Sequence, residues 1–559
     1  MSKRIGEILV EKKLVTPEEL GRALVEHEQT GEFLGATLMK MGCISEEQLL
    51  QSVAEQLNIP FVSLKDITID QAVMSKVPAR IVQHYKIIPI AWEHDVLTIA
   101  LSDPHHMWAV EDIRLHLACE VQAVLACESQ VLEAIRKHYG VGADTIEKIM
   151  AQKQGALEEA AVGLEGRAED IETRAEDASV MKLVDQILQE AIQQRATDIH
   201  IEPGRDELAV RYRVDGVLYD TRVSPDIKYL YSAIVSRIKI MAQLDIAERR
   251  VPQDGRIKIK IGPRELDLRI SILPSVYGEH VVIRILPIEM LFSLEQLGLL
   301  PEDLEKLERV IREPHGLILV TGPTGSGKTT TLYASLSTLN TREKKIITVE
   351  DPVEYELKGI TQIQMNPKVN VTFANSLRSM LRHDPDIMMV GEIRDPETAE
   401  IAVQAALTGH LVFSTLHTND AASGVTRLMH LGIQPYLITS AAKAFIAQRL
   451  VRLLCMECRE KVSNTTSSVL PDASLTSYYR RKGCEACRFT GYKGRTAIYE
   501  ILVVGDRIKE LMLEKAPSDI IKNEAVRSGM RTLYQDGLRK VAAGLTTSEE
   551  ILMITQPWG

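Results

Sequence analysis

The sequence has no uninterrupted apolar stretch approaching the ~18 residues that a transmembrane helix requires. Its first segment, MSKRIGEILVEKK, carries too much charge to contain the apolar core of a signal peptide. Positive charge is also in deficit, because 66 Lys and Arg residues stand against 77 Asp and Glu residues. This balance argues against a nucleic-acid binder that neutralises phosphates over its whole surface. We therefore expect a cytosolic protein without direct nucleic-acid contact, which reaches the membrane only through a partner.

What the sequence does have is length, since 559 residues suggest three or four domains at about 150 residues each. Two 24-residue segments, residues 4–27 and 33–56, align with an offset of 29. In each, an apolar-Gly pair is followed by a Thr or Ser cap (Thr16, Ser45) and an apolar face at helical spacing. We expect a helical tandem-repeat domain over residues 1–59, followed by a small α/β domain over residues 60–139.

Residues 140–180 differ in composition from their surroundings, with ten acidic and four basic residues and no aromatic residue. This composition predicts an acidic linker. Four strand-like segments separated by turn residues predict an α+β domain on an antiparallel sheet over residues 181–290. From residue 291 to residue 559, short buried strands alternate with helical stretches, which is typical of a doubly wound α/β domain.

A phosphate-binding loop stands between a buried strand and a helix in LILVTGPTGSGKTTTLYASL. Glycines at such a loop allow backbone N–H groups to point at phosphates, Lys328 reaches the outer phosphates, and Thr329 can hold Mg²⁺. The predicted nucleotide-binding residues are Gly322, Pro323, Thr324, Gly325, Ser326, Gly327, Lys328, Thr329 and Thr330.

Acidic and histidine residues flank three further predicted strands of this domain, with Asp386 before its strand and Glu392 and Asp395 after it. IITVEDPVEY contributes Glu350, Asp351 and Glu354, and DPDIMMVGEIRD contributes Asp386, Glu392 and Asp395. Hydrolysis needs carboxylates that position water and organise Mg²⁺, and doubly wound sheets place their sites at the carboxyl ends of strands. LTGHLVFSTLHTND adds His410 before a strand and His417 after it, and the polar cluster around His417 suits a sensor of the γ-phosphate.

Seven cysteines in a cytosolic chain of this length do not make a disulfide framework, so their spacing indicates metal binding. Two C-x2-C pairs are separated by 25 residues, and four thiolates fill the tetrahedral shell of a structural Zn²⁺. The predicted ligands are Cys455, Cys458, Cys484 and Cys487, in an insert at about 452–490. Nearby Arg452, Arg459, Arg481 and Lys482 are expected to offset their charge, while Cys43, Cys119 and Cys127 are expected in the core.

These motifs together resemble the secretion ATPase superfamily, and within it the type II secretion and type IV pilus assembly ATPases. The resemblance covers residues 181–559 and rests on four linked motifs in order. It implies a hexameric motor with a RecA-like ATPase domain and a preceding PAS-like α+β domain, acting on an inner-membrane platform. It further implies that Lys328 and Thr329 bind ATP and Mg²⁺, that Glu354 is the general base, that Glu392 has the Walker B role and that His417 reports the nucleotide state.

The same resemblance implies that arginines of the α+β domain reach the phosphates, and five strand arginines qualify: Arg211, Arg213, Arg256, Arg269 and Arg284. The paired cysteine knuckles favour assembly motors over retraction motors. The small α/β domain is expected to dock onto the cytoplasmic part of an inner-membrane protein.

The N-terminal repeat is similar to a tandem 24-residue cyclic-di-GMP-binding module. Arg4, Gly6, Gly35 and Gln56 are the matching residues expected to contact the ligand, whereas His27 and Phe33 stand where the module has Gln and Arg. Two other functions stay open at this point. One is a cyclic-di-GMP-responsive regulatory scaffold that hardly hydrolyses ATP, and the other is a DNA-directed RecA-like motor.

Overall fold

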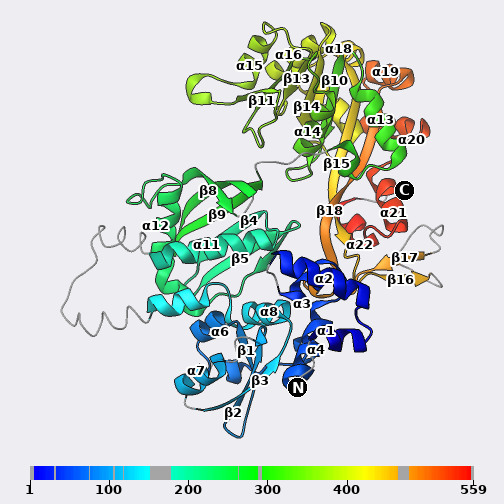
Figure 1. The fold of residues 1–559 in the computed structure, drawn as a ribbon. Coiled ribbons are helices and arrows are strands. Elements are labelled where there is room, and N and C mark those ends of the chain that lie inside the picture. Colours follow the sequence, from blue (N-terminus) through cyan, green and yellow to red (C-terminus); the bar gives the residue numbers. More distant parts are fainter. Residues whose placement is uncertain are drawn as a thin grey trace. The chain divides into compact units, whose positions relative to one another are not determined.

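The computed structural model (Figure 1) describes residues 5–30, 33–74, 76–104, 108–117, 119–150, 178–261, 264–287, 293–463 and 477–555. The chain divides into two compact units, Met1–Leu286 and Pro287–Gly559. Within the described ranges, no helix combines the length and the apolar character needed to cross a membrane.

Four helices form the N-terminal repeat: α1 (Ile5–Glu11), α2 (Pro17–Thr30), α3 (Leu34–Lys40) and α4 (Glu46–Leu57). The expected caps are present, because the hydroxyl oxygens of Thr16 and Ser45 accept hydrogen bonds from backbone N–H groups three residues later. A Cβ on Gly6 would lie 3.1 Å from Leu20, and a Cβ on Gly35 would lie 2.7 Å from Leu49. The same glycine–leucine contact therefore recurs in both copies at the offset of 29.

The next domain is a three-stranded sheet in the order β1-β2-β3, with β1 antiparallel and β3 parallel to β2. Its apolar core is formed by residues of the strands and of α6 and α8. The elements are η1 (Leu64–Asp66), α5 (Gln71–Met74), α6 (Ala79–Tyr85), β1 (Ile87–Glu93), β2 (Val96–Leu101), α7 (Trp108–Leu117), β3 (Glu120–Leu125) and α8 (Glu128–Tyr139).

The α+β domain is a six-stranded sheet in the order β6-β5-β4-β9-β8-β7. One sheet face packs on α11 and α12, and the other is polar along β4, as alternation along a strand requires. The elements are α11 (Ala178–Gln193), β4 (Asp198–Pro203), β5 (Leu208–Val214), β6 (Val217–Asp220), η3 (Pro225–Leu230), α12 (Tyr231–Met241), β7 (Gln253–Ile261), β8 (Arg264–Ser275) and β9 (Gly278–Pro287).

The acidic linker expected over residues 140–180 was placed too early in the chain. Val141 makes a β-bridge to Val223, and residues 143–150 are helical. Ile146 and Ile149 are buried in the core of the α+β domain. Burial of these two apolar side chains stabilises the fold by more free energy than the neighbouring acidic residues cost. Composition alone therefore misplaced the start of the linker. Residues 151–177 lie outside the described residues.

The second unit contains a seven-stranded sheet in the order β12-β11-β13-β14-β10-β15-β18 (Figure 1). All neighbouring strands are parallel except β15 and β18. Along β10, Leu317 and Leu319 face one apolar core while Ile318 and Val320 face another. Burial on both faces is the mark of a doubly wound sheet, and the predicted fold class is confirmed.

The strands of this unit are β10 (Gly316–Thr321), β11 (Ile346–Glu350), β12 (Thr361–Gln364), β13 (Ile387–Val390), β14 (Leu411–Leu416), β15 (Ala442–Leu454), β16 (Glu460–Ser463), β17 (Ser477–Arg480) and β18 (Tyr492–Val503). The helices are η4 (Leu294–Leu297), α13 (Pro301–Ile311), α14 (Lys328–Leu339), η5 (Pro367–Val369), α15 (Phe373–Met380), α16 (Pro396–Leu407), α17 (Ala421–His430), α18 (Pro435–Ala441), η6 (Glu485–Cys487), α19 (Asp506–Leu513), α20 (Ser518–Arg527), α21 (Leu533–Ala542) and α22 (Ser548–Ile554).

Candidate active site and metal centre

The phosphate-binding loop connects the carboxyl end of β10 to the first turn of α14, as its sequence context predicted. Gly325 and Gly327 have φ values of 78° and 87°, which favour glycine. Space also excludes a side chain, because a Cβ on Gly322 would lie 2.6 Å from the Gln448 carbonyl oxygen. The loop is therefore a close backbone cradle at a helix N-terminus, which is the geometry that binds phosphate.

Polar groups of the loop fit a triphosphate. The Lys328 ammonium donates to the carbonyl oxygens of Gly322 and Pro323 at 2.8 and 3.1 Å, so it lies folded over the loop. The hydroxyl of Ser326 is buried and has no hydrogen-bond partner among the described residues. Burial lowers the pKa of Lys328, and the charge of Glu392 opposes this shift. Thr329 and Thr330 are half-buried on the first turn of α14, while Pro323 and Thr324 are exposed.

Glu392 and His417 come together at the carboxyl ends of β13 and β14. The His417 Nε2 atom lies 3.2 Å from Glu392 Oε2, and Arg394 Nη2 lies 2.6 Å from Glu392 Oε1. Glu392 is buried, whereas 46% of the His417 side chain is exposed. Because Glu392 also acts electrostatically on Lys328, Lys328, Glu392 and His417 form one polar cluster beside the phosphate loop.

The loop after β14 is tied to the strand that enters the phosphate loop. The Thr418 N–H donates to the Thr321 hydroxyl at 3.0 Å. Arg449 of β15 donates from Nη2 to the Asn419 carbonyl oxygen at 2.8 Å, and burial lowers its pKa. A Cβ on Gly322 would lie 3.0 Å from Arg449 Nη1, so this guanidinium adjoins the cradle. Sequence reasoning missed Arg449, whose only signal was a basic residue in a largely apolar strand.

The acidic segment after β11 is connected to α14 by Tyr333. The Tyr333 hydroxyl donates to Glu350 Oε2 and accepts a hydrogen bond from the Glu354 N–H at 3.3 Å. Glu350 also accepts from the Thr348 hydroxyl and from the Gln362 amide. Burial raises the pKa of Glu350, although these hydrogen bonds act in the opposite direction. Glu350 is thus a buried carboxylate held by three side chains, and Glu354, the predicted general base, is half-buried.

Three of the polar residues singled out in the sequence have structural partners instead. Asp395 caps α16, since its carboxylate accepts from the Thr398 N–H at 2.8 Å. Asp386 accepts from the Lys345 N–H at 2.7 Å before β13 begins. His410 lies at the end of α16, with Nδ1 3.0 Å from the Ala405 carbonyl oxygen. His410 precedes β14 and is therefore at the opposite edge of the sheet from His417.

Three of the five predicted phosphate-reaching arginines lie on one face of the α+β sheet and are paired with carboxylates of β4. Arg213 and Arg284 approach the two oxygens of Asp198 at 3.8 and 3.0 Å. Arg211 pairs with Glu202. Arg284 has 58% of its side chain exposed, more than the other two. Arg256, by contrast, pairs with the buried carboxylate of Asp267 on neighbouring strands.

The four knuckle cysteines converge on one point between β15 and β18. The Cys455–Cys484 and Cys458–Cys487 Sγ–Sγ distances are both 3.7 Å, and that of Cys484–Cys487 is 3.8 Å. A disulfide requires about 2.05 Å. Zn–S bonds of about 2.3 Å in a tetrahedron separate the sulfurs by ~3.8 Å. The donor set and its spacing therefore fit a structural Zn²⁺.

Backbone N–H groups donate hydrogen bonds to the sulfur of Cys487. Although burial acts to raise it, hydrogen bonds from the N–H groups of Cys484 and Gly491 lower the pKa of Cys487 to about 7. Arg452 and Lys482, which the sequence offered for charge compensation at the site, pair with Glu550 and Glu460 respectively.

Arg459 and Arg481 lie over the rings of Tyr479 and Tyr492. The remaining cysteines differ in burial, because Cys127 is buried while Cys43 and Cys119 are half-buried.

In the N-terminal repeat, Gly6 and Gly35 face leucine side chains of the following helix. Their absence of a Cβ thus serves helix packing in this structure. Gln56 is half-buried on α4, and Arg4 lies outside the described residues.

A doubly wound sheet with a phosphate loop, and with a carboxylate–histidine pair at its carboxyl edge, defines a P-loop nucleotide-binding domain. The family model described as Type II/IV secretion system protein matches residues 173–553, and the MshEN domain model matches residues 57–145. The chain belongs to the type II/IV secretion system protein family and is an ATPase of that family. The MshEN match falls on the small α/β domain and not on the helical repeat.

Full-length relatives agree with this assignment. The chain is 42% identical to the type IV pilus assembly ATPase PilB of Myxococcus xanthus, over 100% of both chains. It is 42% identical to the type II secretion system protein E of Xanthomonas campestris, over 99% of this chain and 98% of that one. The solved structure of the ATPase DotB from Legionella pneumophila has the same fold over 66% of this chain and 94% of its own, with a TM-score of 0.51 and 22% identity.

Proposed function

We propose that this protein is a hexameric motor that couples ATP hydrolysis to assembly of a type IV pilus or a pilus-like type II secretion apparatus, working at the inner membrane through partner proteins. The observation that carries the proposal is the cluster of Lys328, Glu392 and His417 around a phosphate cradle. Relatives named for both machines match the chain from end to end at the same identity, so the similarity supports this class of motor and does not choose between the two.

Binding of ATP would place its phosphates at the N-terminus of α14. The ammonium of Lys328 would leave the carbonyl oxygens of Gly322 and Pro323 for the outer phosphates. Ser326 would find in a phosphate oxygen the partner that its buried hydroxyl does not have among the described residues. Thr329 is the proposed hydroxyl ligand of Mg²⁺, which would neutralise charge on the phosphates when bound.

Hydrolysis would use the carboxylates at the sheet edge. Glu354 is the proposed general base that orients the attacking water, and Glu392 the Walker B acid. His417, bonded to Glu392, would change partner when the γ-phosphate leaves. Because Thr418 is bonded to Thr321 at the entrance of the loop, this change would be passed to the phosphate cradle itself.

The arginines of the α+β domain would complete the phosphate site. Arg284 is the strongest candidate, because its side chain is the most exposed of the three carboxylate-paired arginines. Arg211 and Arg213 are also proposed to contact the phosphates, and their side chains are less exposed than that of Arg284.

The test is ATP turnover by the purified full-length protein. Lys328→Ala is expected to abolish nucleotide binding, whereas Glu354→Gln and Glu392→Gln should bind ATP but not hydrolyse it. Lys344→Ala and Glu343→Gln alter exposed residues of the loop before β11 and serve as controls. Normal turnover in the Lys328 and Glu354 variants would refute the site.

We also propose that the N-terminal repeat regulates the motor by binding cyclic-di-GMP. The duplicated Gly–Leu contact supports a two-copy module, and the adjoining domain matches the MshEN model. Calorimetric titration with cyclic-di-GMP, with the ATPase assayed with and without it, tests the proposal. Absence of binding to the full-length chain would leave the repeat as a docking platform only.

A further inference from the structure

Two histidines and a glutamate meet on the polar face of the α+β sheet. On β4, Ile199 and Ile201 face the apolar core, so His200 and Glu202 project from the other face. β9 pairs with β4 in antiparallel fashion, with Ile201 opposite Val281. This register places His280 beside Glu202, although the two residues are far apart in the sequence.

The ligand atoms of the three side chains converge. Glu202 Oε1 lies 3.1 Å from His280 Nε2 and 3.7 Å from His200 Nδ1. All three side chains offer one ligand atom within 4.8 Å of the others. Divalent metal ions bind such atoms at about 2.1 Å, and a tetrahedral or octahedral shell then separates neighbouring ligands by ~3.0–3.4 Å. The separations in the structure require only small side-chain movements to reach these values.

Hydrogen bonding does not account for this arrangement. His280 Nε2 is buried and has no hydrogen-bond partner among the described residues, even though a carboxylate oxygen lies 3.1 Å away. Two ligand atoms that both point at a metal position would lie this close together without being aligned for a hydrogen bond. Only 15% of the His200 side chain, 20% of Glu202 and 33% of His280 are exposed, so the cluster is partly enclosed.

We propose that His200, Glu202 and His280 form a binding site for a divalent transition-metal ion, distinct from the phosphate cradle and from the cysteine knuckle. Two imidazoles and one carboxylate suit Zn²⁺, Mn²⁺, Fe²⁺ or Co²⁺, whereas Mg²⁺ and Ca²⁺ prefer oxygen ligands alone. Three protein ligands leave at least one coordination position open, on the face of the sheet that carries Arg211 and Arg213.

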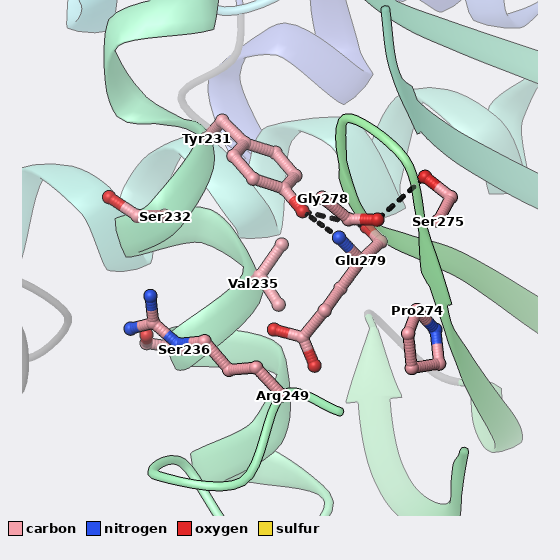
Figure 2. Close-up of a pocket in the computed structure, with 9 residues that line it drawn as sticks. All are labelled: Tyr231, Ser232, Val235, Ser236, Arg249, Pro274, Ser275, Gly278 and Glu279. Carbon is pink, nitrogen blue, oxygen red and sulfur yellow. Dashed lines mark hydrogen bonds between the residues drawn. The ribbon is translucent and has the colours of Figure 1, made fainter. Parts of the chain in front are cut away.

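The surroundings hold two of the ligands in place. Arg211 pairs with the second carboxylate oxygen of Glu202, which leaves Oε1 for the metal, as outer-shell partners of metal ligands do. Figure 2 shows how the start of β9 is fixed, with the Tyr231 hydroxyl hydrogen-bonded to the backbone of Glu279 on both its N–H and its carbonyl. The Glu279 side chain turns inward to the buried Lys239. The next residue, His280, therefore projects from the polar face.

The experiment uses the full-length protein with zinc already in the knuckle, without nucleotide. The protein is titrated with Co²⁺ by calorimetry, and cobalt and zinc are counted by elemental analysis after equilibrium dialysis. His280→Gln and Glu202→Gln remove one ligand each. His315→Gln, at an exposed position in the other unit, is the matched control. Circular dichroism of each variant reports whether it is folded.

Wild type and His315→Gln are expected to bind one cobalt per chain with no loss of zinc, and with an absorption spectrum free of thiolate charge-transfer bands. In His280→Gln and Glu202→Gln the cobalt affinity should fall at least tenfold while zinc content is unchanged. Equal cobalt binding by wild type and the folded ligand variants would overturn the proposal, and so would wild-type protein that takes up no cobalt beyond its knuckle. Neither outcome depends on the ATPase assignment.

Discussion

Replacing Tyr333 by Phe is expected to separate positioning from binding in the ATPase site. The Tyr333 hydroxyl lies on the same helix as Lys328 and connects it to the acidic segment, donating to Glu350 and accepting from the Glu354 N–H. The ring keeps its packing in the variant, so the loss is confined to the hydroxyl. Tyr333 touches neither phosphate nor water in our scheme, so it is a positioning residue.

The size of the effect follows from the burial of Glu350, which is 3% exposed. A hydrogen bond to a buried charged acceptor contributes about 1.5–3 kcal/mol. If the released segment lets Glu354 leave its catalytic position, this energy corresponds to a loss of about 10- to 100-fold in kcat. KM for ATP should change by less than about threefold, because Lys328 and the glycine cradle are untouched.

The variant should also change the pH dependence of stability. Burial raises the pKa of Glu350 above its ordinary value of 4.5, and the Tyr333 hydrogen bond moderates the rise. An acid whose pKa is higher in the folded state binds its proton more tightly there. Its contribution is therefore most favourable below pH 4.5 and is lost as the pH rises through the folded-state pKa. Without the hydroxyl the pKa rises further, so the loss towards neutral pH becomes larger.

Steady-state ATPase kinetics and thermal unfolding at several pH values measure these effects. Tyr436→Phe is the matched control, since this tyrosine is 59% exposed on α18. Unchanged kcat in Tyr333→Phe would show that the helix does not position the acidic segment. A rise in KM with constant kcat would instead assign Tyr333 to nucleotide binding.

Three further predictions concern other parts of the chain. Cys484→Ser should lower zinc from about one ion per chain to a substoichiometric amount by elemental analysis, and full retention would exclude this cysteine as a ligand. Lys540→Met leaves the carboxylate of Asp536, which is 1% exposed, without its ion-pair partner. The free energy of unfolding measured by urea denaturation should fall by about 3–5 kcal/mol, and it should recover when Asp536 is also replaced by Leu. Gly35→Ala meets a leucine at 2.7 Å and should destabilise the repeat by about 1–3 kcal/mol, whereas Gly21→Ala, with nothing within 4 Å, should be neutral or stabilising in thermal unfolding.

Local motifs were sufficient for the parts of the site that are contiguous in sequence. The phosphate loop is defined by the positions of its glycines and by the strand and helix that flank it. Residues 322–329 lie between β10 and α14, as the sequence predicted. The knuckle cysteines were likewise found from two short spacings, and the structure brings their sulfurs to tetrahedral separation. The caps of the helical repeat follow from a hydroxyl and its third neighbour.

Errors arose where a residue's partner is distant or its burial depends on packing. Asp386 lies in the same acidic segment as Glu392, but its carboxylate accepts a hydrogen bond from the N–H of Lys345, 41 residues away. Asp395 caps the helix that follows it, a local role that the acidic composition of the segment did not indicate. The start of the linker was misplaced because Ile146 and Ile149 are buried in the core of the α+β domain, whereas the residues around them are acidic. Arg449 went unnoticed because the order of strands, not the sequence, puts β15 beside β10.

The class of ATPase could be inferred from the chain before folding, because a phosphate loop, a C-x2-C pair and a duplicated helical unit are each defined by residues that are neighbours in the sequence. Which charged groups act together became visible in the folded chain. Strand order brings Glu392 to His417, the Tyr333 hydroxyl connects α14 to the acidic segment, and strand register brings His280 to Glu202. The physical reason is that electrostatic and coordination contacts act over a few ångströms, and in a folded chain sequence separation does not set those distances.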